Sequence, residues 1–301
     1  MSPALTFLVP NDVLLVGASF DVQGADIDGS GLITLTDNDL EIEVAAPPLA
    51  NMVAIAPGTF QMGSPEPVGL APYYNQAVSQ PVHPVAITRP FWMGRFEVTQ
   101  EEYHAVTGSN PSYFSGTNFP VEQVSWIDAV AYCDALTVLE AAAGRLPSGY
   151  EYRLPTEAEW EYCCRAGTTS EWSSGDSLDC MHANHYYSGV HCVYNVNGPG
   201  GAYASAVGSL SANPWGLHDM HGNVWEWCLD GYFAGTAYST GAVSDPFVDS
   251  GSDPTALYRL FRGGSLLYQS YYCRSASRYW SLPNYTVYVI GFRVVCAPVL
   301  P

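Results

Sequence analysis

Lysine is absent from this sequence: all ten basic residues are arginine, and they face 29 aspartates and glutamates. The formal net charge at pH 7 is therefore −19. Because an acidic surface repels phosphate backbones and anionic lipid headgroups, neither nucleic acid nor a membrane surface is an expected partner. Solubility alone also accounts for such acidity, so the charge does not indicate one kind of ligand.

Long apolar runs are missing as well. No segment approaches the roughly 20 apolar residues that span a bilayer, so no membrane insertion is expected. The chain starts Met1-Ser2-Pro3 without a basic stretch followed by an apolar one, so no signal peptide is visible.

The eight cysteines include no Cys-x-x-Cys pair. A zinc ribbon or a thioredoxin-like site needs such a pair, so neither is predicted. The even number is compatible with disulfides in an extracellular or cell-surface protein. Buried free thiols in a cytosolic protein are the alternative.

Three parts follow one another along the chain. Residues 1–44 show the apolar alternation of short strands, at Leu5–Val9, Ser19–Val22, Leu32–Leu35 and Leu40–Val44. Residues 45–50 (AAPPLA) are typical of a linker, and residues 51–301 form the main domain.

Acidic residues in the first part have the spacing of a calcium-binding EF-hand loop, from Asp26 to Asp37. An EF-hand needs a helix on each side, and the flanking sequence has no helical period. A hairpin turned at residues 28–31 is therefore preferred.

Capping boxes predict three helices in the main domain. They begin after Thr99, Ser125 and Thr156 and reach about Val106, Ala142 and Cys164. The face of the second helix is expected to bury Ala129, Val130, Cys133, Leu136 and Leu139. Long irregular segments follow at residues 166–214 and 230–257, and segments of this length usually carry function.

Seven blocks in order resemble those of the formylglycine-generating enzyme, or sulfatase-modifying factor, family. They are Ala54–Ser64 (AIAPGTFQMGS), Phe96–Tyr103 (FEVTQEEY), Pro120–Trp126 (PVEQVSW), Tyr152–Tyr162 (YRLPTEAEWEY), Gly222–Trp227 (GNVWEW), Arg262–Ser265 (RGGS) and Gly291–Arg293 (GFR). The resemblance spans about residues 51–298. It implies an α+β, C-type-lectin-like fold with a small mixed β-core, two or three helices and extensive loops.

Catalytic members of this family oxidise a sulfatase cysteine to formylglycine with copper held by two cysteines. The two thiols follow the Gly-Gly-Ser block, five residues apart, which places them at Tyr268 and Cys273 here. Cys273 also resembles a later, structural cysteine of the family. Since copper(I) needs two soft thiolates, we expect no copper and no catalytic residues. A catalytic, copper-dependent sulfatase-modifying factor remains the alternative.

The resemblance also implies a calcium ion held by Asn223, the carbonyl of Val224 and Glu226, because hard oxygen ligands suit calcium. By the same resemblance, Cys164 is expected to pair with Cys273. Cys133–Cys296 and Cys180–Cys192 are further, weaker pairings.

Residues 266–290 are rich in tyrosine, with six in 25 residues, and contain no Asp, Glu or Lys. Tyrosine and serine dominate antibody paratopes, where stiff rings provide contact area at low entropic cost. Neighbouring rings such as Tyr271-Tyr272 and Tyr279-Trp280 would point to both faces of a strand, so some must reach solvent. The alternative is that these aromatics simply pack in a β-rich core.

The same segment resembles the variable proteins of diversity-generating retroelements, a subset of this family. The shared framework lies at Arg262–Ser265, Cys273–Ala276, Arg278 and Gly291–Arg293. The resemblance implies a non-catalytic protein with a variable surface for an unknown protein or glycan ligand. An ordinary non-catalytic member of the family is the alternative.

The predicted ligand contacts are Leu267, Tyr268, Gln269, Tyr271, Tyr272, Ser277, Tyr279, Trp280, Ser281, Tyr285, Tyr288 and Val289. We expect Arg262, Arg274, Arg278 and Arg293 to hold the backbone beneath them through hydrogen bonds to loop carbonyls or acids.

Overall fold

The computed structural model describes residues 51–65, 79–187, 189–193, 195–232, 240–248 and 258–300, and the backbone of three short strands before residue 51. These strands are β1 (Ala25–Ile27), β2 (Leu32–Leu35) and β3 (Glu41–Glu43), which form one antiparallel sheet. The β1–β2 pairing brackets residues 28–31 and confirms the predicted hairpin. The strands predicted at Leu5–Val9 and Ser19–Val22 lie outside the described residues, as does the linker at 45–50.

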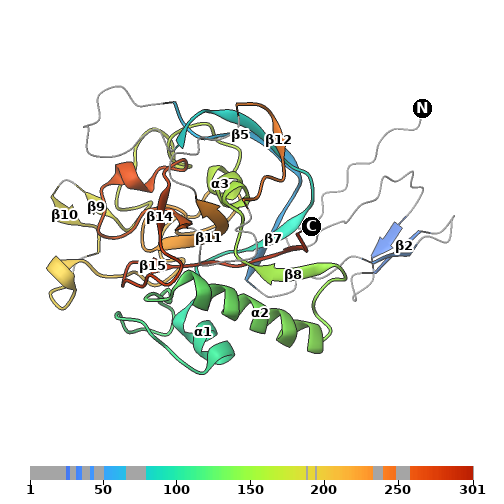
Figure 1. The fold of residues 1–301 in the computed structure, drawn as a ribbon, viewed down its shortest axis with the longest axis horizontal. Coiled ribbons are helices and arrows are strands. Elements are labelled where there is room, and N and C mark those ends of the chain that lie inside the picture. The colour runs from blue at the N-terminus through green and yellow to red at the C-terminus, as the bar shows by residue number, and fades with distance from the viewer. Residues whose placement is uncertain are drawn as a thin grey trace.

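Three helices begin where the capping boxes predict. They are α1 (Gln100–Thr107), α2 (Trp126–Ala142) and α3 (Glu157–Arg165), and each N-cap hydroxyl accepts a hydrogen bond from the backbone three residues on. α2 packs against α1 and β8 (Tyr150–Arg153), whereas α3 packs against strands of the other side of the domain (Figure 1). None of the helices in the described part is long and apolar enough to cross a membrane.

The predicted buried face of α2 is partly wrong. Ala129, Cys133 and Leu136 are buried, but Leu139 is 49% exposed. Tyr132 is buried instead, because its ring stacks on Tyr103 of α1 with 5.4 Å between the centroids. The contact with α1 thus rotates the buried stripe toward residue 132.

Two four-stranded sheets carry most of the fold. One has the order β4 (Met52–Ile55), β7 (Phe91–Gly94), β16 (Val295–Pro298), β8. The other has the order β14 (Tyr279–Ser281), β13 (Tyr258–Arg262), β11 (Trp225–Tyr232), β15 (Ile290–Gly291). The second sheet brings the tyrosine-rich segment beside the Gly222–Trp227 block.

Smaller elements complete the domain. A three-stranded sheet has the order β12 (Val243–Ser244), β6 (His83–Ile87), β5 (Gly58–Met62). β9 (Tyr186–Tyr187) and β10 (Val190–His191) form a hairpin, and short 3₁₀ turns occur at η2 (Pro199–Gly201) and η3 (Ser270–Cys273). The architecture is therefore α+β, with few helices and many short strands. The domain boundaries at 44 and 51 stay a prediction.

The hydrophobic core forms two main clusters. Trp225 and Trp227 of β11 belong to the first with Phe292, and their side chains are at most 2% exposed. Trp160 of α3 and Leu260 of β13 belong to the second. Because Trp225 and Trp227 lie two residues apart on β11, both rings pack into the first cluster.

Candidate ligand-binding surface

Six aromatic side chains follow one another across the second sheet, and we call them the aromatic row: Tyr271, Tyr272, Tyr268, Trp225, Tyr279 and Trp280. Their consecutive ring centroids lie 5.1–5.9 Å apart. Such separations are typical of favourable edge-to-face or offset packing. Trp225 is buried at the centre, so the tyrosines on each side of it are anchored to the core while their outer edges meet solvent.

Exposure separates the predicted contacts into two groups. Tyr279 is 43% exposed, and Tyr268, Tyr271, Tyr272 and Trp280 are half-buried. These five rings of the aromatic row therefore reach solvent as predicted, although each keeps part of its area against neighbours, whereas Trp225 is buried.

Two predicted contacts are wrong, because Ser277 and Val289 are buried. The Ser277 hydroxyl donates to the Tyr271 carbonyl at 3.0 Å, and its own carbonyl accepts a hydrogen bond from Arg262. The Val289 carbonyl accepts from the backbone N–H of Trp225 at 2.8 Å, and its side chain joins the first core cluster. Both residues support the surface from beneath.

The remaining predicted contacts lie around the row. Gln269 and Tyr285 are exposed, and Leu267 and Ser281 are half-buried. Tyr288 is also half-buried, but its ring packs against Tyr113 and Phe114, at 5.5 and 6.0 Å, rather than within the row.

Arg262 fixes the backbone below the row, as predicted. Its side chain is fully buried and forms an ion pair with Glu161 of α3. Its Nη1 donates to the carbonyls of Ser275 and Ser277, at 3.1 and 2.6 Å. A charged donor buried with a carboxylate and two carbonyls holds the turn after η3 in one place.

Arg274 and Arg278 are the next two supports, and both use acids as predicted. Arg274 pairs with Glu171 at 2.8 Å, donates to the Tyr271 carbonyl at 3.1 Å, and lies 4.1 Å from the centre of the Tyr271 ring. Arg278 binds both oxygens of Glu157, at 2.5 and 2.7 Å. The row therefore rests on charges that tie it to α3 and to the loop that follows.

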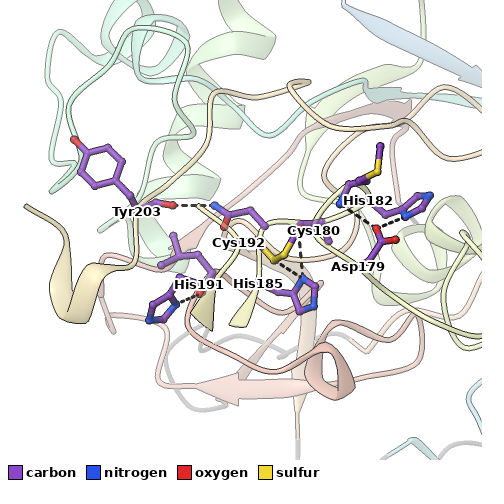
Figure 2. The surroundings of a disulfide bond; sticks show 11 residues. Asp179, Cys180, His182, His185, His191, Cys192 and Tyr203 are labelled. Carbon is purple, nitrogen blue, oxygen red and sulfur yellow. Dashed lines mark hydrogen bonds and ion pairs between the residues drawn. A yellow bond between two sulfur atoms is a disulfide. The ribbon is translucent and has the colours of Figure 1, made fainter. Parts of the chain in front are cut away.

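The β9–β10 hairpin adds a wall that the sequence did not predict. The Tyr186 N–H donates to the Tyr268 carbonyl at 2.9 Å, and the His191 ring donates to the Leu266 carbonyl at 3.1 Å. Figure 2 shows the disulfide Cys180–Cys192 that closes this loop. Tyr187 of this hairpin is 44% exposed.

The Cys180–Cys192 pairing is confirmed. This pairing also locates part of the site, because the loop that the disulfide closes contacts the aromatic row. The His185 ring lies 3.5 Å from the Cys192 sulfur (Figure 2), and burial lowers the pKa of His185.

The other two predicted disulfides are wrong, because Cys164, Cys273, Cys133 and Cys296 are all buried free thiols. The Cys164 sulfur faces the His221 ring at 3.8 Å, and the Cys273 sulfur faces the backbone carbonyl of Gln269, just before η3, at 3.9 Å. Burial raises the pKa of Cys164 to about 12 and raises the pKa of Cys273.

The two positions of the family's copper-binding thiols differ in kind. Tyr268 is part of the aromatic row, with its ring 5.6 Å from Trp225. Cys273 is fully buried, and its sulfur packs against Gly264 where a larger residue would carry its Cβ. A phenol and a buried thiol with a raised pKa are a poor ligand set for copper(I), which prefers two thiolates.

Two of the three predicted calcium ligands, the side chains of Asn223 and Glu226, accept hydrogen bonds from the protein itself. The Asn223 side-chain oxygen accepts from the backbone and hydroxyl of Ser205, at 3.0 and 3.1 Å. Both Glu226 oxygens lie 2.6 Å from nitrogens of Arg293, whose positive charge opposes a dication. Val224 is buried beside them. These residues do not fit a calcium ion in this arrangement, although the family resemblance implies one.

Acidic residues do gather nearby. Burial, helped by the charges of Asp219 and Glu226, raises the pKa of Glu97, whose carboxylate accepts from Asn223 at 3.1 Å. Arg293 partly offsets these charges. Within the described ranges, no group of three or more His, Cys, Asp or Glu side chains is arranged to hold a metal ion.

Comparison with known proteins identifies the family of this chain. The sulfatase-modifying factor enzyme 1-like domain matches residues 39–298. The formylglycine-generating enzyme of Streptomyces coelicolor is 30% identical over 295 residues, 95% of this chain and 87% of that protein. The mouse enzyme is 31% identical over 226 residues, 73% of this chain, which spans 54% of the mouse protein's length.

Among solved structures, Treponema denticola variable protein 1 matches with a TM-score of 0.62 and 27% identity, over 82% of this chain and 95% of that one. The match therefore extends over most of the chain and is not confined to one motif. From the family model and these relatives, the chain belongs to the formylglycine-generating enzyme, or sulfatase-modifying factor, family.

Proposed function

We propose that this protein is a non-catalytic binding protein that presents the aromatic row to a protein or glycan ligand on a C-type-lectin-like scaffold. The observation that carries the proposal is the row itself: partly exposed rings on both sides of the buried Trp225, in continuous contact and held from below by buried ion pairs. Tyrosine and tryptophan are the commonest binding hot spots, since they bury large areas while keeping a polar group.

Rigid support favours binding over simple core packing. The arginines beneath the row satisfy backbone carbonyls of the same loop that carries the rings, so the backbone does not depend on the exposed side chains. A surface held in this way loses little conformational entropy when a ligand binds.

The division between buried and exposed residues also matches a variable-protein organisation. Arg262, Cys273, Arg274 and Arg293 of the framework are buried, whereas most of the residues between them are half-buried or exposed. We propose that the exposed positions are the ones that vary, as the likeness to a protein named as variable supports. A near-identical DNA repeat differing mainly at adenines, beside the gene, would support diversification; its absence would contradict it.

The disulfide bears on where the protein acts. Disulfides persist in oxidising compartments, so Cys180–Cys192 supports a location outside the cell or on its surface. Detection of both cysteines as free thiols in protein isolated from its native compartment would contradict this location.

Catalytic formylglycine generation is the second candidate function, because the curated relatives are named as formylglycine-generating enzymes. Tyr268 and the buried Cys273 oppose it. In an assay with copper and a sulfatase-derived cysteine peptide, we expect no formylglycine. Turnover that disappears in Cys273→Ser would establish the catalytic function instead.

The binding function can be tested with a glycan array and a displayed protein library, using the full chain as bait. The matched baits are the double variant Tyr268→Ser/Tyr279→Ser and the control Val138→Ser, an exposed apolar position on α2. We expect hits that the control retains and the double variant loses. If neither screen yields a ligand, or the double variant keeps every hit, the proposed function is wrong.

A further inference from the structure

A second cavity lies at the edge of the first four-stranded sheet, on elements that the aromatic row does not use. β4 is the terminal strand of the order β4-β7-β16-β8, so in the described part of the chain its outer edge has no partner strand. Its residues Val53–Ile55 and the following Ala56 line a cavity of about 520 Å³. Cavities of this size hold small ligands or a few residues of a peptide.

The wall opposite β4 is a rigid turn. The Asn213 side-chain oxygen accepts from the backbone N–H groups of Trp215 and Leu217, at 3.0 and 3.1 Å, and its amide donates to the Cys163 carbonyl at 2.7 Å. The Trp215 ring meets the Tyr162 ring edge to face, 4.8 Å between centroids. The cavity is therefore bounded by a fixed turn and two aromatic rings.

Arg95 is the only arginine among the described residues that line this cavity. Its Nη1 donates to the Gly216 carbonyl at 3.2 Å. Seven of the ten arginines form an ion pair with a carboxylate, and Arg95 forms none with the residues that the structure describes. The chain has a net charge of −19, yet the half-buried Arg95 guanidinium has no carboxylate partner among the described residues. Its positive charge can therefore bind an anionic group of a ligand.

We propose that the outer edge of β4 and Arg95 bind an extended peptide segment that carries a carboxylate. The peptide backbone would pair with the outer edge of β4, which has no partner strand among the described residues. Its carboxylate would meet the Arg95 guanidinium, which is shaped to bind two oxygens at once. The carboxylate is either the C-terminus of the peptide or an acidic side chain within it.

The probe is an array of random hexapeptides, each synthesised as a free acid and as a C-terminal amide, with and without an internal glutamate. Labelled full-length protein is applied to the array, and selected peptides are then titrated in solution. We expect binding to require a carboxylate. If free acids bind and amides do not, the C-terminal carboxylate of the peptide is the ligand. If amides that contain glutamate bind as well as the free acids, the glutamate side chain is the ligand.

The matched variants are Arg95→Gln and Arg89→Gln. Arg89 is also half-buried with one backbone carbonyl contact, to Val299 at 3.4 Å, and it likewise has no ion pair among the described residues. We expect at least tenfold weaker peptide binding for Arg95→Gln and no change for Arg89→Gln, at unchanged melting temperature. Tyr279→Ser should bind the peptides normally, which separates this site from the aromatic row.

Backbone hydrogen exchange gives the second readout. A bound strand should slow exchange in residues 53–56, because edge amides become hydrogen-bonded. Binding that is independent of a carboxylate, or that leaves these amides unprotected, would overturn the proposal, as would the absence of any bound peptide. Self-association that Arg95→Gln abolishes would identify a second copy of this chain as the occupant and would also overturn it.

Discussion

Replacing Arg262 with methionine is the sharpest test of the frame beneath the aromatic row. The change keeps an unbranched apolar side chain but removes the guanidinium, with its ion pairs to the buried Glu161 and Glu157 and its hydrogen bonds to the Ser275 and Ser277 carbonyls. Removing one partner of a buried ion pair lowers the free energy of unfolding by about 3–5 kcal/mol, because the other charge stays buried without its partner. Arg165 still pairs with Glu161, so we expect the lower half of that range.

The assay is urea-induced unfolding of the wild type, Arg262→Met and the control Arg145→Met. The Arg145 side chain is 56% exposed and pairs with Glu140, so its removal should cost about 0–1 kcal/mol. A loss of about 3 kcal/mol is a large part of the 5–15 kcal/mol that stabilises a typical domain. The reasoning is refuted if Arg262→Met costs no more than Arg145→Met.

Three further predictions follow from buried groups. Burial and the nearby charge of Glu157 raise the pKa of Asp230 to about 7, so the folded state keeps a proton that the unfolded chain loses near pH 4. Stability should therefore fall as pH rises from about 4 to 7, and urea unfolding of Asp230→Asn should show a smaller fall; an equal fall contradicts the assignment. Gly264→Ala should cost more than about 2 kcal/mol in the same assay, since Gly264 has φ +76° and a Cβ there would lie 2.4 Å from the Cys273 sulfur; a loss below 1 kcal/mol contradicts this. Chelation with EDTA should leave the melting temperature unchanged, because Glu226 is bound by Arg293, and a fall of several degrees would show a calcium ion that this arrangement does not accommodate.

The sequence predicted the helix starts well, because the interactions that set them join residues close together in the chain. Each capping box joins a side chain to a backbone group three residues away, so Thr99, Ser125 and Thr156 mark helix starts without knowledge of the fold. The face of α2 was less accurate, since Tyr132 is buried by a ring on another helix. Burial depends on partners that the local pattern does not contain.

The candidate site shows the same division. The framework arginines were predicted with their kind of partner, acids and loop carbonyls, because a buried guanidinium must find such groups. Ser277 and Val289 were placed at the surface by their position in a tyrosine-rich run, yet long-range hydrogen bonds to Arg262 and Trp225 turn them inward. Alternation along one segment cannot show such partners.

The hairpin wall and the free cysteines were missed for a related reason. Contact of Tyr186 with Tyr268 joins residues 82 positions apart, and only the Cys180–Cys192 pairing hinted that this loop was fixed. Cys164 and Cys273 were paired by resemblance, but a disulfide depends on side-chain direction, which the sequence does not give.

The most direct test of the proposed function is the affinity of Tyr279→Ser for the first ligand recovered from the screens, measured by titration calorimetry beside the wild type and Val138→Ser. Tyr279 lies between Trp225 and Trp280 in the aromatic row and is 43% exposed. Loss of a central aromatic contact commonly costs about 2 kcal/mol or more, so we expect the dissociation constant to rise at least tenfold. Val138→Ser should bind like the wild type. Equal affinity of all three proteins would contradict a binding surface centred on the aromatic row.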